Sequence, residues 1–456
     1  MTTRRRKRRN KLPAEALELT ISGISHEGRG VSHIEGKVAF VDGSLPDEIV
    51  SAKYVRNRSQ FSEFKTLEVK KPSPERVTPP CEYAAICGGC SLQHWDSDKQ
   101  LDFKQGVLLE HLQHSAQLDA GSFEVLPQIK AKTTNYRRKA RLAVRKVVKK
   151  DAVLVGFREK YSSFITVMDN CQVLVAEVAI LIEPLKTLFF SLNAADEIPQ
   201  IEVAVGESAA EEDASKCVSL VIRHLKPLNE QDKLILENFA AKKGIEIYLQ
   251  PAGIDSVNKL FPKDDCNRLH YYLPEFGLDI TFHPMDFTQI NGAINRSIVS
   301  RAIQMLDLSD KDTVLDLFCG LGNFTLPIAL RAGKVIGIEG SQKMVERGTE
   351  NALNNDIANT AFYAADLASP IEKENWYQKD YSKILLDPPR SGAIEIIPQI
   401  AKLRAAKIVY ISCNPATLAR DTAELLKYGY RLNSAGVMDM FPHTTHVESM
   451  AEFLLI

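Results

Sequence analysis

The fold is decided by residues 313–323, which read TVLDLFCGLGN. The first six residues form a mostly apolar run, as expected of a buried strand. The next five form a turn that contains two glycines, and residues 324–331 continue with a pattern that suits a helix. A buried strand, a glycine turn and a helix in this order predict the beginning of a sheet with helices packed on its faces.

The same alternation of apolar strands and helices continues along the chain. It predicts a parallel, doubly wound α/β sheet, and hence a Rossmann-like domain over residues 271–456. Besides the first strand, the expected elements are strands at 335–339, 362–364, 383–386 and 408–411 and a second helix at 341–354.

Polar residues stand where these strands end, which is the edge of an open sheet that binds ligands. Gly320 and Gly322 would let the backbone pass close to a ligand, but Thr325 replaces the third glycine of a dinucleotide-binding motif. Glu339 is suited to the hydroxyls of a ribose, and Asp366 to the amino group of an adenine. Ribose and adenine without a diphosphate fit S-adenosylmethionine, so the pattern predicts a methyltransferase.

A cysteine at the end of the fifth strand is a candidate nucleophile, although a buried cysteine is also a common apolar residue. Cys413 stands at the same edge as Asp387. A thiolate that adds to C6 of uracil makes C5 a carbon nucleophile, which can then accept a methyl group. A base must afterwards remove the C5 proton, and Glu448 is the candidate. His443 and His446 are rivals, because the ordinary pKa of histidine is nearer neutrality.

The charge of the chain is unevenly distributed. Residues 1–150 hold 28 Lys and Arg against 17 Asp and Glu, whereas residues 151–456 hold 29 against 41. We expect residues 1–11 to be a basic, disordered arm, and residues 12–71, with short strands separated by glycines, to form a small five-stranded β-barrel. A basic front half predicts a nucleic acid as the partner.

Residues 72–270 are expected to form a central, mixed α/β domain. Its most basic part, residues 130–150, holds ten Lys and Arg and no acidic residue. Tyr136 precedes Arg137 there, and an aromatic ring beside positive charge is typical of proteins that bind single-stranded RNA. A solvated charged surface would have the same composition.

Cysteines cluster at the start of this central domain. Cys81, Cys87 and Cys90 lie within ten residues, and Cys171 is the fourth candidate ligand. Four thiolates suit a tetrahedral zinc ion or a [4Fe–4S] cluster. The spacing alone favours zinc, and His94 could replace Cys171 as a ligand.

Taken together, these motifs resemble the RNA uracil-C5 methyltransferases over nearly the whole chain. The stretch 287–291, FTQIN, is similar to the F-x-Q-x-N motif of that family, and Cys413 and Glu448 stand in its S-C-N-P and H-V-E contexts. The resemblance implies that Cys413 is the nucleophile and Glu448 the general base. It also implies that S-adenosylmethionine is bound by Gln289, Phe318, Asn323, Glu339, Asp366 and Asp387.

Within this family, the chain most resembles the enzymes of 23S ribosomal RNA that carry an iron–sulfur cluster. This implies a TRAM domain, an RNA-binding β-barrel, over residues 12–71, and a class I methyltransferase domain over residues 271–456. It also implies a [4Fe–4S] cluster on Cys81, Cys87, Cys90 and Cys171, which reverses the preference for zinc.

The resemblance leaves the substrate and the setting as expectations. A single-stranded or loop uridine of 23S rRNA is the expected substrate, and a tRNA uridine is the alternative. A redox-responsive RNA-binding protein without catalytic activity is a third reading. No apolar run is long enough to span a bilayer, and the basic start leads into no apolar export signal. We therefore expect a cytoplasmic monomer without an obligate protein partner.

Overall fold

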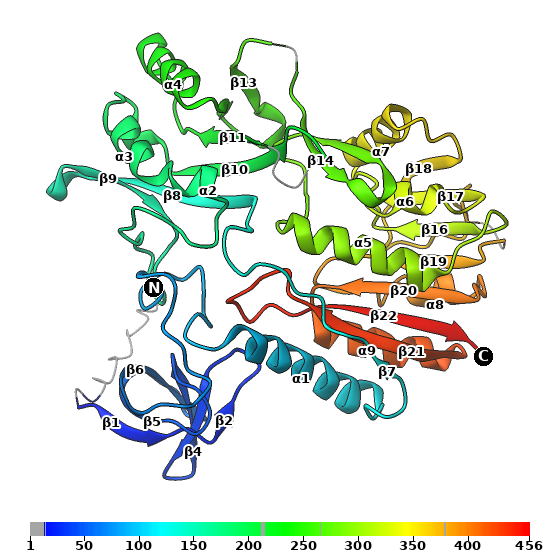
Figure 1. Ribbon diagram of the computed structural model, residues 1–456, viewed down its shortest axis with the longest axis horizontal. Helices are drawn as coiled ribbons and strands as arrows, with labels where there is room; N and C mark the ends of the chain where they lie inside the picture. The colour runs from blue at the N-terminus through cyan, green and yellow to red at the C-terminus, as the bar shows by residue number, and fades with distance from the viewer. Residues whose placement is uncertain (1–12, 14, 211–214, 265, 378–379) are drawn as a thin grey trace, which may run out of the picture. The chain divides into compact units, whose positions relative to one another are not determined.

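The computed structural model describes Pro13 and residues 15–210, 215–264, 266–377 and 380–456 (Figure 1). The basic arm expected at residues 1–11 lies outside the described residues. The chain divides into two compact units, which are treated separately below. The first consists of Met1–Ala85, Cys90–Gln100 and His443–Thr445, and the second of Ile86–Gly89, Leu101–Pro442 and His446–Ile456.

The first unit is built around a six-stranded sheet with the order β1-β5-β6-β4-β3-β2. Ile21 N donates to Glu48 O, and Ser22 N donates to Val31 O, so the segment that joins β1 to β2 is bonded to both of its neighbours and closes the sheet. The structure thus has six strands in place of the five expected, because a second short strand follows the first after two residues. The strands are β1 (Leu17–Thr20), β2 (Gly23–Ile24), β3 (Gly30–Ile34), β4 (Lys37–Asp42), β5 (Ile49–Asn57) and β6 (Phe61–Lys71).

The interior of this small barrel is apolar. Side chains alternate between the inside and the outside of each strand, as the period of two requires. The buried set is Leu19, Ile21, Ala39, Val41, Val50, Ala52 and Phe64.

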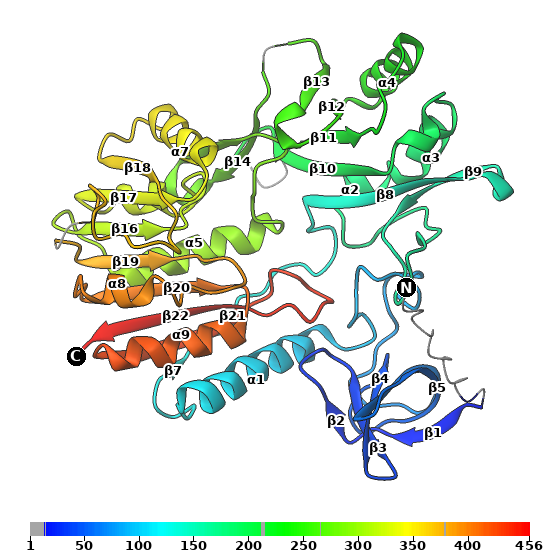
Figure 2. The ribbon, with the colours of Figure 1, turned by 180° about the vertical axis from the view of Figure 1, so that it is seen from behind.

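The second unit contains three sheets (Figures 1 and 2). A mixed six-stranded sheet has the order β13-β12-β11-β10-β8-β9, and β14 pairs with β15. These strands are β8 (Lys139–Val147), β9 (Ala152–Gly156), β10 (Gln200–Glu207), β11 (Lys216–Arg223), β12 (Glu246–Gln250), β13 (Asn258–Phe261), β14 (Leu269–Leu273) and β15 (Leu278–Phe282).

The third sheet has eight strands in the order β18-β17-β16-β19-β20-β22-β21-β7. From β16 the chain adds β17 and β18 on one side and then returns to place β19 on the other, so the topological switch point lies between β16 and β19. The strands are β7 (Glu124–Val125), β16 (Thr313–Leu317), β17 (Lys334–Glu339), β18 (Thr360–Ala364), β19 (Lys383–Leu386), β20 (Lys407–Ser412), β21 (Tyr430–Met438) and β22 (Glu448–Leu455).

This sheet confirms the predicted Rossmann-like architecture, with one difference. β22 lies between β20 and β21 and is antiparallel to both, so the sheet is mixed rather than purely parallel. β21 and β22 are joined directly, without a crossover helix, and this connection requires an antiparallel pair.

Helices cover both faces of the eight-stranded sheet. Leu315 and Leu317 of β16 belong to the core of one face, together with residues of α1, α8 and α9, whereas Val314 belongs to the other, with residues of α5 and α6. The α-helices are α1 (Ser97–Ala116), α2 (Ala176–Ala179), α3 (Ile182–Phe190), α4 (Glu230–Lys243), α5 (Gly292–Leu306), α6 (Thr325–Ala329), α7 (Gln342–Asn354), α8 (Ile397–Ala401) and α9 (Pro415–Lys427). Single 3₁₀ turns occupy Val148–Lys150, Ala195–Glu197, Ile254–Ser256 and Pro274–Phe276.

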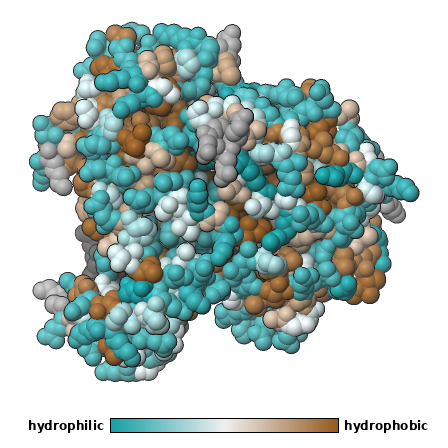
Figure 3. All heavy atoms as spheres, viewed as in Figure 1, coloured by the Kyte–Doolittle hydropathy of each residue, from teal (hydrophilic) through white to brown (hydrophobic). Residues whose placement is uncertain are grey.

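The stretch expected to be a separate central domain contributes to this sheet. β7 pairs with β21, and apolar residues of α1 such as Leu108 and Leu112 belong to the same core as Leu432. None of the described helices is long and apolar enough to cross a membrane. Hydrophilic side chains cover much of the face seen in Figure 3, between smaller apolar patches.

The structure contradicts the expected role of Tyr136. Its side chain is buried, and its hydroxyl donates to Pro442 O at 3.1 Å. Its neighbour Arg137 donates from Nε to Lys139 O and lies 5.8 Å from the ring of Phe157. An aromatic ring that is buried and hydrogen-bonded inside the protein is not a platform on which RNA bases can stack.

Candidate active site

The turn after β16 is bonded to the end of β17. Glu339, the last residue of β17, accepts hydrogen bonds from Gly320 N and from Ser341 N, both at 3.1 Å. Phe318 and Gly320 both have a positive φ, which is unusual for phenylalanine and common where backbone is held for function. The two bonds therefore fix the backbone at the switch point, where open α/β sheets bind ligands.

Asn323, at the end of the same turn, is held by two residues. Asn295 Nδ2 and Tyr271 Oη each donate to Asn323 Oδ1 at 2.9 Å, and Asn323 Nδ2 donates to Asn295 Oδ1 at 3.0 Å. Asn295 lies on α5, whose N-cap is Asn291, the last residue of the FTQIN stretch. These bonds tie the turn after β16 to the loop that carries Gln289.

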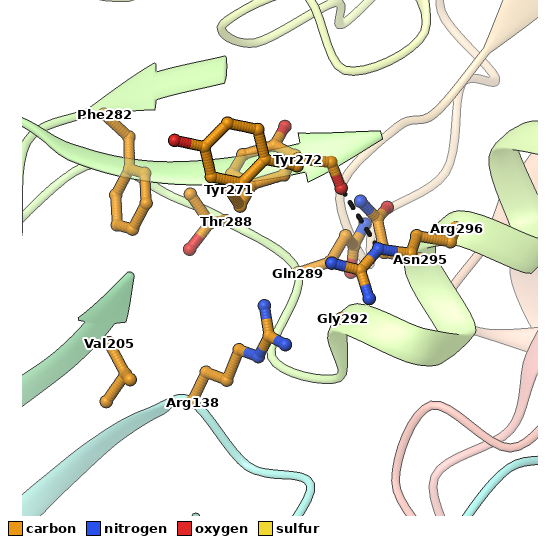
Figure 4. A pocket seen from close by; sticks show the side chains of 10 residues that line it. All are labelled: Arg138, Val205, Tyr271, Tyr272, Phe282, Thr288, Gln289, Gly292, Asn295 and Arg296. Atoms are coloured by element: carbon orange, nitrogen blue, oxygen red, sulfur yellow. Dashed lines mark hydrogen bonds between the residues drawn. The ribbon is translucent and has the colours of Figure 1, made fainter. Parts of the chain in front are cut away.

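A small, open pocket lies beside these residues (Figure 4). Arg138, which directly precedes β8, extends toward Gln289 and the start of α5 at Gly292. A Cβ atom on Gly292 would lie 2.6 Å from the guanidinium of Arg138, so a larger residue there would require the guanidinium to move. The lining includes Arg138, Tyr271, Thr288, Gln289, Asn295 and Arg296.

A buried carboxylate fixes the cationic side of this pocket. Glu207 accepts from Arg138 at 2.5 Å, from Arg296 at 2.7 and 2.9 Å and from Tyr272 N at 3.0 Å. Burial alone would raise the pKa of Glu207, but the two guanidinium groups and the backbone amide hold it below its ordinary value. Arg138 is therefore held in place by Glu207, and its guanidinium is directed toward the pocket.

Three aspartates stand at or near the carboxyl ends of the strands. Asp387 follows β19, and burial raises its pKa to about 7. Asp316 is buried within β16; it accepts from Thr325 Oγ1 at 2.6 Å, and burial raises its pKa to about 8. Asp366, beyond β18, is exposed and accepts from Ser369 Oγ and Ala368 N, which hold its pKa below the ordinary value.

The candidate nucleophile and base come from neighbouring strands. In the antiparallel pair of β20 and β22, Ser412 lies directly opposite Ser449. Cys413 directly follows Ser412, and Glu448 directly precedes Ser449, so the two residues come next to each other at this end of the pair, where the charge of Glu448 acts on the Cys413 thiol. On its other side, Glu448 is paired with Met438 of β21. The structure thus brings together the two residues predicted to carry out the chemistry.

The electrostatics around this pair are dominated by burial and negative charge. Burial and the charges of Glu448 and Asp387 raise the pKa of Cys413 to about 11, while Arg390 opposes the shift. Burial and Asp387 raise the pKa of Glu448 to about 8, and Arg390 and Lys104 oppose this shift. At neutral pH the cysteine is thus a thiol, beside a carboxyl group that exchanges protons near neutrality.

The two rival histidines lie in different units. His443 belongs to the first unit, where His443 N donates to Gln100 Oε1 at 3.0 Å and its Nδ1 lies 3.3 Å from Gln100 Nε2. His446 belongs to the second, with its Nδ1 3.2 Å from Arg390 Nη2. Desolvation and the charges of Arg390, Lys104 and Arg137 lower the pKa of His446 to about 4, so its ring is neutral.

The candidate metal ligands are largely buried. Cys87, Cys90 and Cys171 are buried and Cys81 is partly exposed, and none of them forms a disulfide. Gly89 N donates to Cys87 Sγ at 3.4 Å, as backbone amides do to thiolate sulfur. Over the described residues, no group of three or more His, Cys, Asp or Glu side chains is arranged to hold a metal ion.

Sequence reasoning missed the residues that hold the site in place. Asn295 and Tyr271 fix Asn323, Glu207 fixes Arg138, and Lys104 lies near Glu448. Lys104 alone left a signal, because it occupies an apolar position in the helical stripe of Leu101, Leu108 and Leu112.

Comparison with protein families gives two matches. The model of the tRNA (uracil-5-)-methyltransferase family matches residues 97–454, and that of the TRAM domain matches residues 12–63. Among curated relatives, the 23S rRNA (uracil(1939)-C(5))-methyltransferase RlmD of Hahella chejuensis is 50% identical over 451 residues, which cover 98% of this chain and 99% of that protein. The protein of the same description from Alcanivorax borkumensis is 48% identical over 447 residues, with 98% of each covered.

Among solved structures, the fold matches the tRNA (uracil-54, C5)-methyltransferase of Pyrococcus abyssi in complex with S-adenosyl-L-homocysteine. The TM-score is 0.70 at 23% identity, and the match covers 96% of this chain and 100% of that one. This similarity agrees with an N-terminal TRAM domain that is followed in the sequence by a class I methyltransferase fold.

Proposed function

The chain belongs to the tRNA (uracil-5-)-methyltransferase family, and we propose that it transfers a methyl group from S-adenosylmethionine to C5 of one uridine in 23S ribosomal RNA. The observation that supports this proposal is the pairing of β20 with β22 up to Ser412 and Ser449, the neighbours of Cys413 and Glu448, together with the effect of the Glu448 charge on the Cys413 thiol. A thiol and a carboxyl group side by side at the ligand-binding edge are what methylation of a pyrimidine carbon requires. Relatives at 43–50% identity that are described as 23S rRNA methyltransferases support 23S rRNA, and not tRNA, as the substrate.

The reaction begins with Cys413. Its thiol gives its proton to solvent, the sulfur bonds to C6 of the uracil, and the electron pair of the C5–C6 double bond moves toward the C4 carbonyl to form an enolate. C5 then attacks the methyl group of the donor, whose carbon–sulfur bond breaks to release S-adenosylhomocysteine. Glu448 removes the proton from C5, the double bond re-forms and the bond between Cys413 and C6 breaks. Each step uses a group that lies at this edge of the sheet.

The target base must leave its stack to reach Cys413. A loop or single-stranded uridine costs the least to extract, which agrees with the expected substrate. Because the reaction acts on ribosomal RNA, we propose that it takes place in the cytoplasm.

We propose that S-adenosylmethionine binds along the turn after β16. The carboxylate of Glu339 can accept from ribose hydroxyls with the lone pairs that Gly320 N and Ser341 N leave available. Asp366 is exposed beyond the next strand and suits the adenine amino group. Gln289, Phe318, Asn323 and Asp387 complete the proposed set.

A direct test of the function compares two substrates. Purified protein is incubated with labelled S-adenosylmethionine and either unmodified 23S rRNA or unmodified tRNA, and the nucleosides are separated by mass spectrometry. We expect 5-methyluridine in the rRNA, at a single position, and none in the tRNA. Label confined to tRNA would support the alternative substrate, and binding of the donor without any methylated nucleoside would contradict an enzymatic function.

We further propose that Cys81, Cys87, Cys90 and Cys171 hold a [4Fe–4S] cluster. The donor set fits, because it consists of four thiol groups outside disulfides, and the Gly89 amide already donates to Cys87 Sγ. The cluster would stabilise the surrounding loops, since methyl transfer needs no electron.

Anaerobic purification is expected to give a brown protein with about four iron and four sulfide ions per chain. Cys171→Ala should lose the visible absorbance and most of the iron, whereas Cys217→Ala, at an exposed cysteine, should keep both. Stoichiometric zinc without sulfide would favour the zinc site instead.

A further inference from the structure

Lys104 is a buried lysine in the middle of α1. Its side chain is 0% exposed, and its ammonium group donates to Asp439 Oδ1 at 2.6 Å and to Phe441 O at 3.0 Å. Asp439 is itself buried. After Gln100, the other buried positions on this stripe of α1, such as Leu101, Leu108 and Leu112, are apolar, so a leucine or methionine at position 104 would meet the packing pattern of the helix.

Such a pair contributes little to stability by itself. Removing an ammonium and a carboxylate from water costs several kcal/mol per ion, and apolar replacements of buried ion pairs are often neutral or stabilising. Burial accordingly lowers the pKa of Lys104, although Asp439 and Glu448 oppose the shift. Because the burial of the Lys104–Asp439 pair costs free energy, we infer that Lys104 has a role other than packing.

The two groups bound by Lys104 lie next to the base. Met438 of β21 is paired with Glu448. Asp439 directly follows Met438, and Phe441 comes shortly after it. Lys104 therefore fixes the backbone where the chain leaves β21, before it returns as β22 with Glu448 as the first residue. If the segment after β21 moved, Met438 would move with it and would displace its strand partner Glu448.

Lys104 also supplies positive charge to a surplus of negative groups. The charged and titratable groups that act on Glu448 are the acidic Asp387 and the cationic Arg390 and Lys104, and Glu448 acts in turn on Cys413. Asp439, the partner of Lys104, follows the ladder partner of Glu448. Arg390 is exposed, and water screens its charge. Lys104 is enclosed in protein, where the interaction with a carboxylate is stronger.

We propose that Lys104 is a positioning residue for the general base: through Asp439 and Phe441 it fixes the turn beside Glu448, and its buried charge favours the carboxylate form of Glu448. This inference rests on the proposed function. It assigns to α1 a part in the removal of the C5 proton and no part in the attack of Cys413 or in the binding of the methyl donor.

The test separates methyl transfer from proton removal. RNA that carries tritium at C5 of the target uridine releases tritium only when the proton is removed, whereas labelled donor reports methyl transfer. In Lys104→Met we expect methyl transfer to the covalent adduct at near the wild-type rate, with tritium release about tenfold slower near neutral pH. The rise of tritium release with pH should move upward by about one unit, because an opposite charge near the carboxylate has been removed.

Two further variants keep the test decisive. Lys104→Met with Asp439→Asn removes both charges, so no unpaired carboxylate is left buried if the single variant fails to fold. Lys383→Met breaks a comparable ion pair, with 3.0 Å between Lys383 Nζ and Asp312 Oδ2, at the amino end of β19, away from the site. We expect the double variant to slow tritium release as Lys104→Met does, with a smaller shift of the pH profile because the negative charge of Asp439 is removed as well. Lys383→Met should keep the wild-type rates and pH profile.

Three results would overturn the proposal. A folded double variant that releases tritium at the wild-type rate and pH would show that Glu448 does not need Lys104. A loss confined to methyl transfer would move the role of Lys104 to another step, and a double variant that fails to fold would make the pair structural. By contrast, a wild-type protein that releases no tritium would contradict the proposed function itself.

Discussion

Replacing Cys413 by serine is expected to lower turnover by roughly four orders of magnitude or more, as removal of a catalytic nucleophile does. Serine fits the same space beside Glu448, so the fold and the binding of the methyl donor should remain. Its hydroxyl is a far weaker acid than a thiol, even one whose pKa is raised to about 11 as that of Cys413 is. The covalent bond to C6 would therefore not form. The measurement is methyl transfer to 23S rRNA, with donor affinity measured by calorimetry.

A trapping experiment gives the matched control. RNA with 5-fluorouridine at the target position should form a stable adduct with the wild-type protein, because fluorine at C5 blocks proton removal. The adduct should be absent in Cys413→Ser and unchanged in Cys217→Ser, which alters an exposed cysteine of β11. An adduct that still formed with Cys413→Ser would rule out this nucleophile.

Replacing Glu448 by glutamine is expected to stop the reaction after methyl transfer. The amide cannot accept the C5 proton, so turnover should fall by about 10²- to 10⁴-fold, the usual contribution of a general base. Methylated RNA should then remain attached to Cys413. The measurement is the fraction of protein that migrates with labelled RNA under denaturing conditions.

The dependence of proton removal on pH follows from the pKa of Glu448. Only the carboxylate accepts the proton, and the pKa of Glu448 is raised to about 8. The rate should therefore rise with pH up to about 8 and level off above it, whereas a carboxyl group with an ordinary pKa would give a flat profile from about pH 6 upward.

The comparison variant is His446→Ala. We expect it to keep proton removal within a few-fold of the wild-type rate. If His446→Ala accumulated the methylated adduct and Glu448→Gln did not, the base would be the histidine.

Much of the methyltransferase sheet could be predicted because its strands are buried on both faces. Such strands are nearly uninterrupted apolar runs, so their bounds can be predicted closely. The strand predicted at 383–386 has the same bounds in the structure, and the one predicted at 335–339 begins one residue later than the observed Lys334–Glu339. The polar residues Glu339 and Asp387 stand out because each ends one of these runs. Parallel strands then bring them to one edge without further information.

Other features depend on contacts between distant parts of the chain. The position of β22 between β20 and β21 has no local signature, yet it brings Glu448 to the end of β20 that Cys413 follows. Tyr136 next to Arg137 has the composition of an RNA-binding surface, but its ring is buried and bonded to Pro442, some 306 residues away in sequence. The bonds of Asn323 with Asn295 and Tyr271 likewise join residues whose spacing carries no periodic signal.

Because Cys413 directly follows β20 and Glu448 begins β22, the main chain of two paired strands in the middle of a sheet holds both residues. Six successive residue pairs of β20 and β22 maintain this arrangement. No lid has to close and no loop has to become ordered for sulfur and carboxyl to meet. Their alignment should accordingly survive heating for as long as the sheet does, and alterations in surface loops should change which RNA is accepted more readily than they change the chemistry.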